Sequence, residues 1–78
     1  MYNEQAELDT IKSEHFFIMA GDFLPVNAFD NQDLHLEMHK AKLEELKKSI
    51  LEPSKLSENQ VLLLEAHIAL HEQTKKRI

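Results

Sequence analysis

The residues of this chain best suited to chemistry are two pairs of histidines with the same spacing. They are His35-x-x-x-His39 and His67-x-x-x-His71. Residues four apart on an α-helix share one face, so each pair forms an edge that carries two imidazoles. Pro53 lies midway between the pairs, and a chain reversal there brings His35 level with His71 and His39 level with His67. Folding alone would then gather four imidazoles at one height of a helical hairpin.

Such a cluster suggests a metal site. Neutral imidazole binds zinc, copper and nickel, and structural zinc takes four tetrahedral ligands. The candidate metal ligands are His35, His39, His67 and His71, and zinc is the candidate cofactor. The carboxylates of Asp33, Glu37 and Glu65 each lie two residues before one of these histidines. They point to a different face of their own helix, so they are poorly placed to hydrogen-bond the metal-binding histidines of that helix.

The same histidines also have explanations that need no metal. In a polar layer, imidazoles hydrogen-bond each other, the backbone, or Glu14 and Asp30 across the bundle. In a further alternative, the histidines face a partner chain. From the residues alone we favour the polar layer, with the metal site second, and we expect His15 to be an isolated interfacial residue rather than a fifth ligand. Because clustered imidazoles resist charging, we also expect stability to fall on acidification.

Catalysis is not expected. A zinc hydrolase of this type needs His-Glu-x-x-His, whereas Glu37 lies two residues after His35 and on another face. Di-iron bundles use Glu-x-x-His, and no histidine here has a glutamate three residues before it. The chain has neither a cysteine nucleophile nor a glycine-rich phosphate loop. Four histidine ligands would also fill the shell of zinc and leave no position for a substrate.

Composition places the chain among small helical domains. It has 78 residues, 42% of them hydrophobic and 29% charged, with one glycine and no cysteine, which excludes disulfides and thiolate metal sites. The net charge is −5, and the basic cluster Lys75-Lys76-Arg77 suits the last turn of a helix, so direct sequence-specific nucleic-acid binding is not expected. No apolar run approaches about 18 residues, so no membrane span is expected, and a signal peptide is not indicated either.

Three helices are expected to position the histidines. Apolar residues recur at spacings of three and four over about residues 4–19, 31–51 and 58–76. The predicted fold class is all-α: a single domain over residues 1–78, built as a small three-helix bundle with an antiparallel helical hairpin. The predicted apolar contacts come from Leu8, Ile11, Ile18, Leu36, Leu43, Leu46, Ile50, Val61, Leu64 and Ile68.

Particular residues mark the ends of these helices. Gly21 is a C-terminal stop for the first helix, and Pro53 breaks the second. Asp30 is predicted to cap the start of the second helix. Ser57 is predicted to form a capping box with Gln60 at the start of the third.

An extended connector is expected after the first helix. Residues 22–29 contain apolar side chains and a proline but show no helical period. We expect this segment to pack Phe23, Val26 and Phe29 against the helices. A short strand over residues 23–26 is an alternative for part of it.

Several apolar residues lie outside the predicted core. Leu62, Leu63 and Leu64 point three ways around their helix, and a bundle this small cannot cover every apolar face. We therefore predict an oligomer or a partner surface. The predicted interface residues are Leu34, Met38, Leu62 and Leu70.

An ordered string of residues runs through these elements. It is Glu14-His15-x-x-x-Met19-x-Gly21-x-x-x-Pro25-Val26-x-x-x-Asp30, followed by His35 and His39, and later by His67-Ile68-x-x-His71. The string resembles the C-terminal region of tailed-phage portal proteins. There, a Gly-x-x-x-Pro-Val stretch leads into an Asp- and His-rich helix, and a later helix carries a similar His-Ile-x-x-His element. The resemblance covers about residues 14–72.

This resemblance implies a non-enzymatic structural module of a phage or prophage. Portal proteins form a ring at one capsid vertex, pass DNA through a central channel, and contact packaging and tail components. The implied partners are further copies or other virion proteins, in the virion or the host cytoplasm. The chain departs from the family in having Asn31 and Gln32 where a further histidine often follows the aspartate, and 78 residues cannot contain a portal's wing, stem and clip. It is then either a C-terminal fragment or a small protein that shares the module. The alternative function is a zinc-stabilised helical binding or regulatory domain that uses both histidine pairs.

Overall fold

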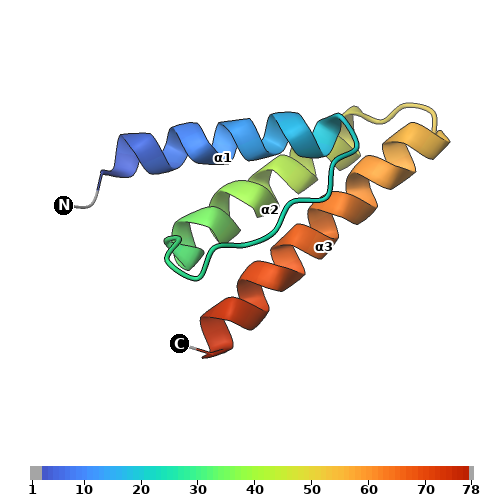
Figure 1. Ribbon diagram of the computed structural model, residues 1–78. Coiled ribbons are helices and arrows are strands. Elements are labelled where there is room, and N and C mark those ends of the chain that lie inside the picture. The colour runs from blue at the N-terminus through green and yellow to red at the C-terminus, as the bar shows by residue number, and fades with distance from the viewer. Residues whose placement is uncertain (1–2, 78) are drawn as a thin grey trace.

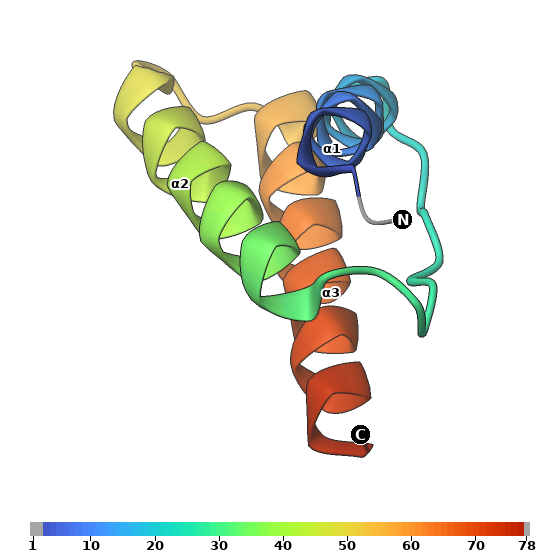
Figure 2. The ribbon, with the colours of Figure 1, turned by 90° about the vertical axis from the view of Figure 1, so that its left-hand side faces the viewer.

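The computed structural model describes residues 3–77, which form three helices. They are α1 (Glu4–Met19), α2 (Gln32–Ser49) and α3 (Lys55–Arg77), and the described residues contain no strand. Helices α2 and α3 form an antiparallel hairpin and make the largest helix–helix contact. Helix α1 crosses over this hairpin at an angle (Figures 1 and 2). The predicted all-α three-helix bundle is confirmed.

The connector between α1 and α2 returns along the molecule, so both helices begin at the same end (Figure 1). It starts at Gly21, whose φ of 99° follows the last turn of α1 and whose N–H donates to the carbonyl of Ile18. This confirms the predicted stop, because a left-handed residue after a helix end favours glycine.

The side chains of the connector are placed differently from the prediction. No strand forms over residues 23–26, and Phe23 and Phe29 are 58% and 96% exposed rather than packed. Successive side chains of an extended segment point to opposite sides. Leu24 and Val26 therefore face the helices and are half-buried, which leaves Phe23 on the solvent side.

Helix α2 begins at Gln32, one residue later than predicted from a cap at Asp30. Asn31, not Asp30, is the N-cap, and its side chain accepts a hydrogen bond from the N–H of Leu34. The carboxylate of Asp30 instead accepts from the N–H of Asn27 in the preceding turn. Both residue types cap helices well, so the choice depends on the turn before the helix.

Helix α3 begins one turn earlier than predicted. The N–H of Ser57 donates to the hydroxyl of Ser54, and the N–H of Ser54 donates to the hydroxyl of Ser57. Ser54, directly after Pro53, thus takes the capping role that was predicted for Ser57. Gln60 is not part of the cap, because its amide donates to the carbonyl of Met19 at 2.8 Å and ties α3 to the end of α1.

The interior is built as much from histidine as from aliphatic side chains. The most fully buried large side chains are Ile11, Ile18, Leu64, His35, His39, His67 and His71. Leu36 and Ile68 complete the buried apolar set, which confirms half of the predicted core. The other predicted core residues, Leu8, Leu43, Leu46, Ile50 and Val61, are half-buried. The centre of the bundle is therefore polar.

Candidate metal centre

The structure gathers the four predicted histidines at one height of the hairpin. Their side chains are buried, and the ring centroids of His35 and His71 lie 4.7 Å apart, as do those of His39 and His67. These are the two level pairs that the reversal near Pro53 predicts. The i,i+4 spacing on α2 and α3 turns both edges toward the space that α1 covers.

A carboxylate from α1 lies between the two edges. Oε1 of Glu14 is 3.2 Å from Nδ1 of His35 and 3.5 Å from Nε2 of His39. Its Oε2 is 3.6 Å from Nε2 of His67 on α3. Only 14% of the Glu14 side chain is exposed. One carboxylate thus faces imidazoles of both other helices.

Two of the histidines are oriented by acceptors that fix which nitrogen carries the proton. His35 donates from Nε2 to Oε1 of Glu7 at 2.8 Å, and His67 donates from Nδ1 to the carbonyl of Leu24 at 3.1 Å. A neutral imidazole has one donor and one acceptor nitrogen. When these imidazoles are neutral, Nδ1 of His35 and Nε2 of His67 therefore carry lone pairs toward the centre.

His71 is oriented by an amide whose own direction is fixed. The Nε2 group of Gln32 donates to the backbone carbonyls of Asn27 and Asp30, so its Oε1 must face Nδ1 of His71, at 2.6 Å. His71 therefore donates from Nδ1 and keeps a lone pair on Nε2. This atom lies 3.2 Å from Nε2 of His67, and neither neutral ring has a proton to place between them. A cation bound by both nitrogens would relieve that contact.

The outer nitrogen of His39 lies at hydrogen-bond distance from a fifth histidine, His15. This Nδ1 atom lies 2.8 Å from Nε2 of His15, which leaves Nε2 of His39 facing Glu14. The expectation that His15 is isolated is therefore wrong. His15 lies outside the cluster and is half-buried, where it supports His39 rather than pointing into the centre.

Three of the atoms that face the centre lack hydrogen-bond partners. Among the described residues, Oε1 of Glu14, Nδ1 of His35 and Nε2 of His39 are buried and unpaired. Together with a ring nitrogen of His71 they lie within 4.8 Å of one another. Donors about 2.0–2.1 Å from a metal, at ordinary bond angles, are about 2.9–3.6 Å apart. The 3.2–3.6 Å separations around Glu14 and between His67 and His71 fall in this range.

Burial and charge act in opposite directions on Glu14 and His35. Burial raises the pKa of Glu14, but its contacts with His35, His39 and His67 outweigh this and hold the pKa well below its usual range. Burial lowers the pKa of His35, but Glu14, Asp30 and Glu7 together raise it. Without a metal, a proton on His35 is therefore the cation that this environment favours.

Three other imidazoles, those of His71, His39 and His15, are kept neutral by lowered pKa values. Burial lowers the pKa of His71 to about 3, with further lowering by His67, His35 and His39. Burial also lowers the pKa of His39 and, with the charges of His39 and Lys42, lowers that of His15 to about 4. Neutral imidazole is the form that binds metal. The donor set thus fits a divalent transition metal.

A second group of potential ligands lies on the outer side of His35. It consists of Glu7, Asp30 and His35, whose donor atoms also lie within 4.8 Å of one another. Glu7 already accepts from Nε2 of His35 and from the N–H of Asn31. Burial raises the pKa of Asp30. This arrangement suits an outer support that orients His35 better than a second ion site.

The carboxylates of the centre come from α1, and the sequence contained a signal for them. Glu7, Ile11, Glu14 and Ile18 follow one another at spacings of four, three and four, which is one helical stripe. Of these carboxylates, Glu14 was predicted as a hydrogen-bond partner in the polar layer, and Glu7 was not. Asp33 and Glu65 form surface ion pairs with Lys75 and Lys47 instead.

Neither a protein-family model, nor a curated protein, nor a solved structure matches this chain. None of the helices within residues 3–77 combines the length and apolar character needed to cross a membrane.

Proposed function

We propose that this chain is a metal-stabilised helical module, in which one divalent metal ion joins α1 to the α2–α3 hairpin. The observation that carries the proposal is that three buried, unpaired donor atoms of α1 and α2 converge with an imidazole of α3. Leaving such atoms without partners costs roughly 1–3 kcal/mol each, and more for charged groups. A bound cation removes that cost, whereas a proton on His35 satisfies only part of the cluster.

The role of the ion is structural. Helix α1 contacts the hairpin less extensively than α2 and α3 contact each other. Its buried apolar side chains are Ile11 and Ile18, and Glu14 lies between them on the same stripe. A metal held by Glu14 and the histidines adds a bond network across this interface, and binding to the folded state alone stabilises that state.

Stoichiometric zinc uptake tests the proposal. Native mass spectrometry of the metal-free chain with one equivalent of zinc should show one ion per chain. Replacing both His39 and His71 by leucine should abolish uptake together with the stability that is linked to metal binding. Glu37→Gln, an exposed substitution beside His39, is the matched control and should bind like the native chain. A native chain that takes up no zinc would leave the polar layer as the explanation.

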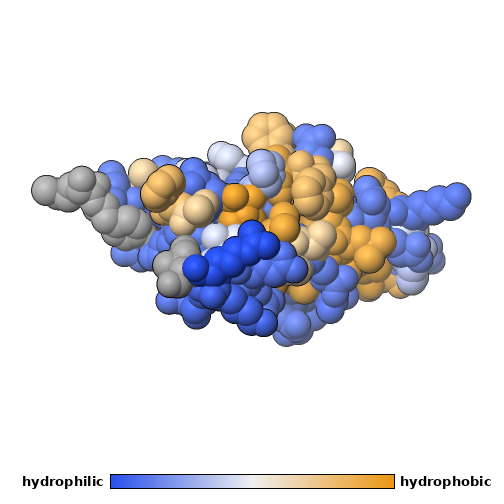
Figure 3. All heavy atoms as spheres, turned by 60° about the horizontal axis from the view of Figure 1, so that its bottom comes forward, coloured by the Kyte–Doolittle hydropathy of each residue, from blue (hydrophilic) through white to orange (hydrophobic). Residues whose placement is uncertain are grey.

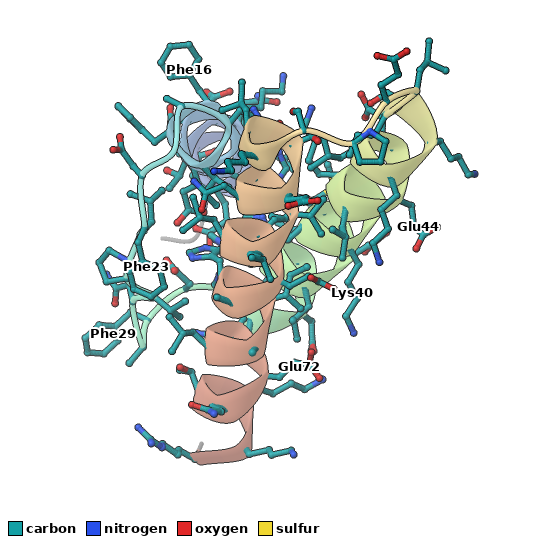
Figure 4. The ribbon with its side chains drawn as sticks, turned by 90° about the vertical axis from the view of Figure 1, so that its right-hand side faces the viewer. Phe16, Phe23, Phe29, Lys40, Glu44 and Glu72 are labelled. Atoms are coloured by element: carbon teal, nitrogen blue, oxygen red, sulfur yellow. The ribbon has the colours of Figure 1, made fainter. Side chains whose placement is uncertain are left out.

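A second candidate function is a self-associating virion module, as the portal resemblance implies. Its support is the apolar surface: Leu62 is 64% exposed and borders a groove of about 540 Å³ with Ile50 and Val61. Apolar side chains gather over part of one face (Figure 3), and Phe16, Phe23 and Phe29 project away from the bundle (Figure 4). The remaining predicted interface residues, Leu34, Met38 and Leu70, are half-buried.

The oligomeric state tests this second candidate. If the chain is such a module, native mass spectrometry without metal should give a discrete oligomer. Leu62→Lys should shift it toward monomer with little loss of stability, since this side chain is largely exposed. Gln73→Lys, at an exposed position of α3, adds the same charge without removing an apolar side chain and is the matched control. A native chain that remains monomeric at all concentrations would contradict self-association, though not the metal centre.

A further inference from the structure

The centre offers more donor atoms than a structural zinc ion uses. Structural zinc sites are almost always four-coordinate. Three imidazoles and one oxygen of Glu14 already lie within 4.8 Å of one another. His67 lies outside that set but adjoins it, because its Nδ1 proton is held by the carbonyl of Leu24 and its Nε2 lies 3.2 Å from Nε2 of His71.

Both oxygens of Glu14 face this set of donors. Oε1 lies beside His35 and His39, and Oε2 lies 3.6 Å from Nε2 of His67. Among the described residues, Oε1 is buried without a hydrogen-bond partner, and the contact given for Oε2 is the one with His67. A carboxylate that enters a cluster with both oxygens directed at different ligands is placed to bind a metal through both of them.

We infer that the centre holds a six-coordinate divalent metal ion, bound by the four imidazole nitrogens and both oxygens of Glu14. This inference rests on the proposed function and specifies its metal. Imidazole is a suitable ligand for first-row metals such as iron and nickel, and carboxylate oxygen is a suitable ligand for harder divalent ions. Six protein donors leave no position for a substrate, so the ion cross-links the helices and does no chemistry on a bound molecule.

Cobalt(II) is a probe that distinguishes coordination numbers. Its visible absorption is intense in a tetrahedral site and weak in a six-coordinate one. The metal-free native chain, titrated with cobalt(II), should bind one ion with weak visible bands. His67→Ala should intensify those bands and weaken cobalt binding by more than the roughly 10–100-fold that loss of an outer hydrogen-bond partner costs. Glu72→Ala, an exposed substitution next to His71, should change neither quantity.

The outcomes separate this inference from the proposal on which it rests. One cobalt ion bound with intense, tetrahedral bands overturns six-coordination and leaves the metal-stabilised module standing. Equal affinity and spectra for the native chain and His67→Ala also overturn it, because His67 is then not a ligand. No cobalt binding at all overturns both. The spectrum of the native chain decides the coordination number even if a variant fails to fold.

Discussion

Single residues outside the centre decide which nitrogen of each histidine is available inside it. Glu7, Gln32 and the carbonyl of Leu24 each accept a hydrogen bond from the outer N–H of one ring. A metal-binding histidine typically donates its other N–H in this way, which fixes the ring and raises its basicity. These partners are therefore as much a part of the centre as the ligands.

Glu7 provides the clearest test of this support. Glu7→Ala removes the acceptor of the Nε2 proton of His35, so metal affinity should fall about 10–100-fold. A competition titration against a coloured chelator measures this affinity. Glu4→Ala removes an exposed glutamate one turn earlier and should leave the affinity unchanged. Equal affinities for the two variants would show that Glu7 does not orient His35.

Acidification should destabilise the metal-free chain. The pKa values of His71 and His15 are lowered from 6.5 to about 3 and about 4, and that of His39 is also lowered. Below pH 6.5 these imidazoles are protonated in the unfolded chain but remain neutral in the folded chain. Their contribution to folding stability is therefore fully present above pH 6.5 and is lost as the pH falls below it. His35 acts oppositely, since its raised pKa favours folding at low pH.

Because three histidine pKa values are lowered and one is raised, acidification should cause a net loss of folding stability. Each net proton taken up on unfolding lowers the free energy of unfolding by about 1.4 kcal/mol per pH unit. For a domain of this size, 1 kcal/mol changes the melting temperature by roughly 4–8 °C. Thermal unfolding followed by circular dichroism should show the fall between about pH 7.5 and 5.5, as imidazoles titrate there. A melting temperature that stays constant or rises would contradict this assignment of neutral imidazoles.

At the scale of elements, helix periodicity and turn residues predicted most of the fold. Helix α1 has the predicted bounds, 4–19, because its apolar spacing and Gly21 are unambiguous signals. The predicted start of α3 was wrong because Ser54 and Ser57, three residues apart, are both suitable caps, and residue type alone does not choose between them. The exposure of Phe23 follows from the alternation of an extended chain, which hydrophobicity alone does not reveal.

Within the candidate site, the two histidine edges were predictable from i,i+4 spacing alone. Glu7 was missed because only the apolar residues of the first helix were used to define its buried face, although Glu7 and Glu14 lie on the same face as Ile11. In a sequence alone, acidic residues on a helix are expected to be exposed to solvent, and only their partners on another helix show that they are buried. The outer supports from Leu24 and Gln32 depend on the path of the connector, which spacing does not determine.

The turn at the end of α1 gives a prediction at this scale. Gly21→Ala forces a side chain into a φ of 99°, and the nearest atom to the added Cβ is Nδ2 of Asn59 at 4.0 Å. The cost therefore comes from the backbone and should be about 1–2 kcal/mol. Urea denaturation measures it, with Asp22→Ala at the neighbouring exposed position expected to stay within about 0.5 kcal/mol of the native chain. Equal losses for both variants would mean that the conformation of Gly21 is not what ends α1.

At the scale of the whole molecule, a polar centre holds together a bundle with little apolar core. Few aliphatic side chains are fully buried, and four imidazoles share the same interior. Small domains with so little core commonly depend on a metal or on self-association. The proposed metal ion and the proposed self-association through the exposed apolar surface are therefore two candidate sources of stability, and each is testable without the other.

Thermal unfolding of the metal-free chain, with and without a divalent metal, tests the central claim most directly. Zinc and nickel should each raise the melting temperature, and most of the rise should be complete at one equivalent of metal per chain. Free metal at 1,000 times its dissociation constant stabilises by about 4 kcal/mol, which raises the melting temperature by roughly 4–8 °C per kcal/mol. Identical melting curves with and without metal would contradict the claim that an ion joins α1 to the hairpin, and would assign the histidines to a hydrogen-bonded layer.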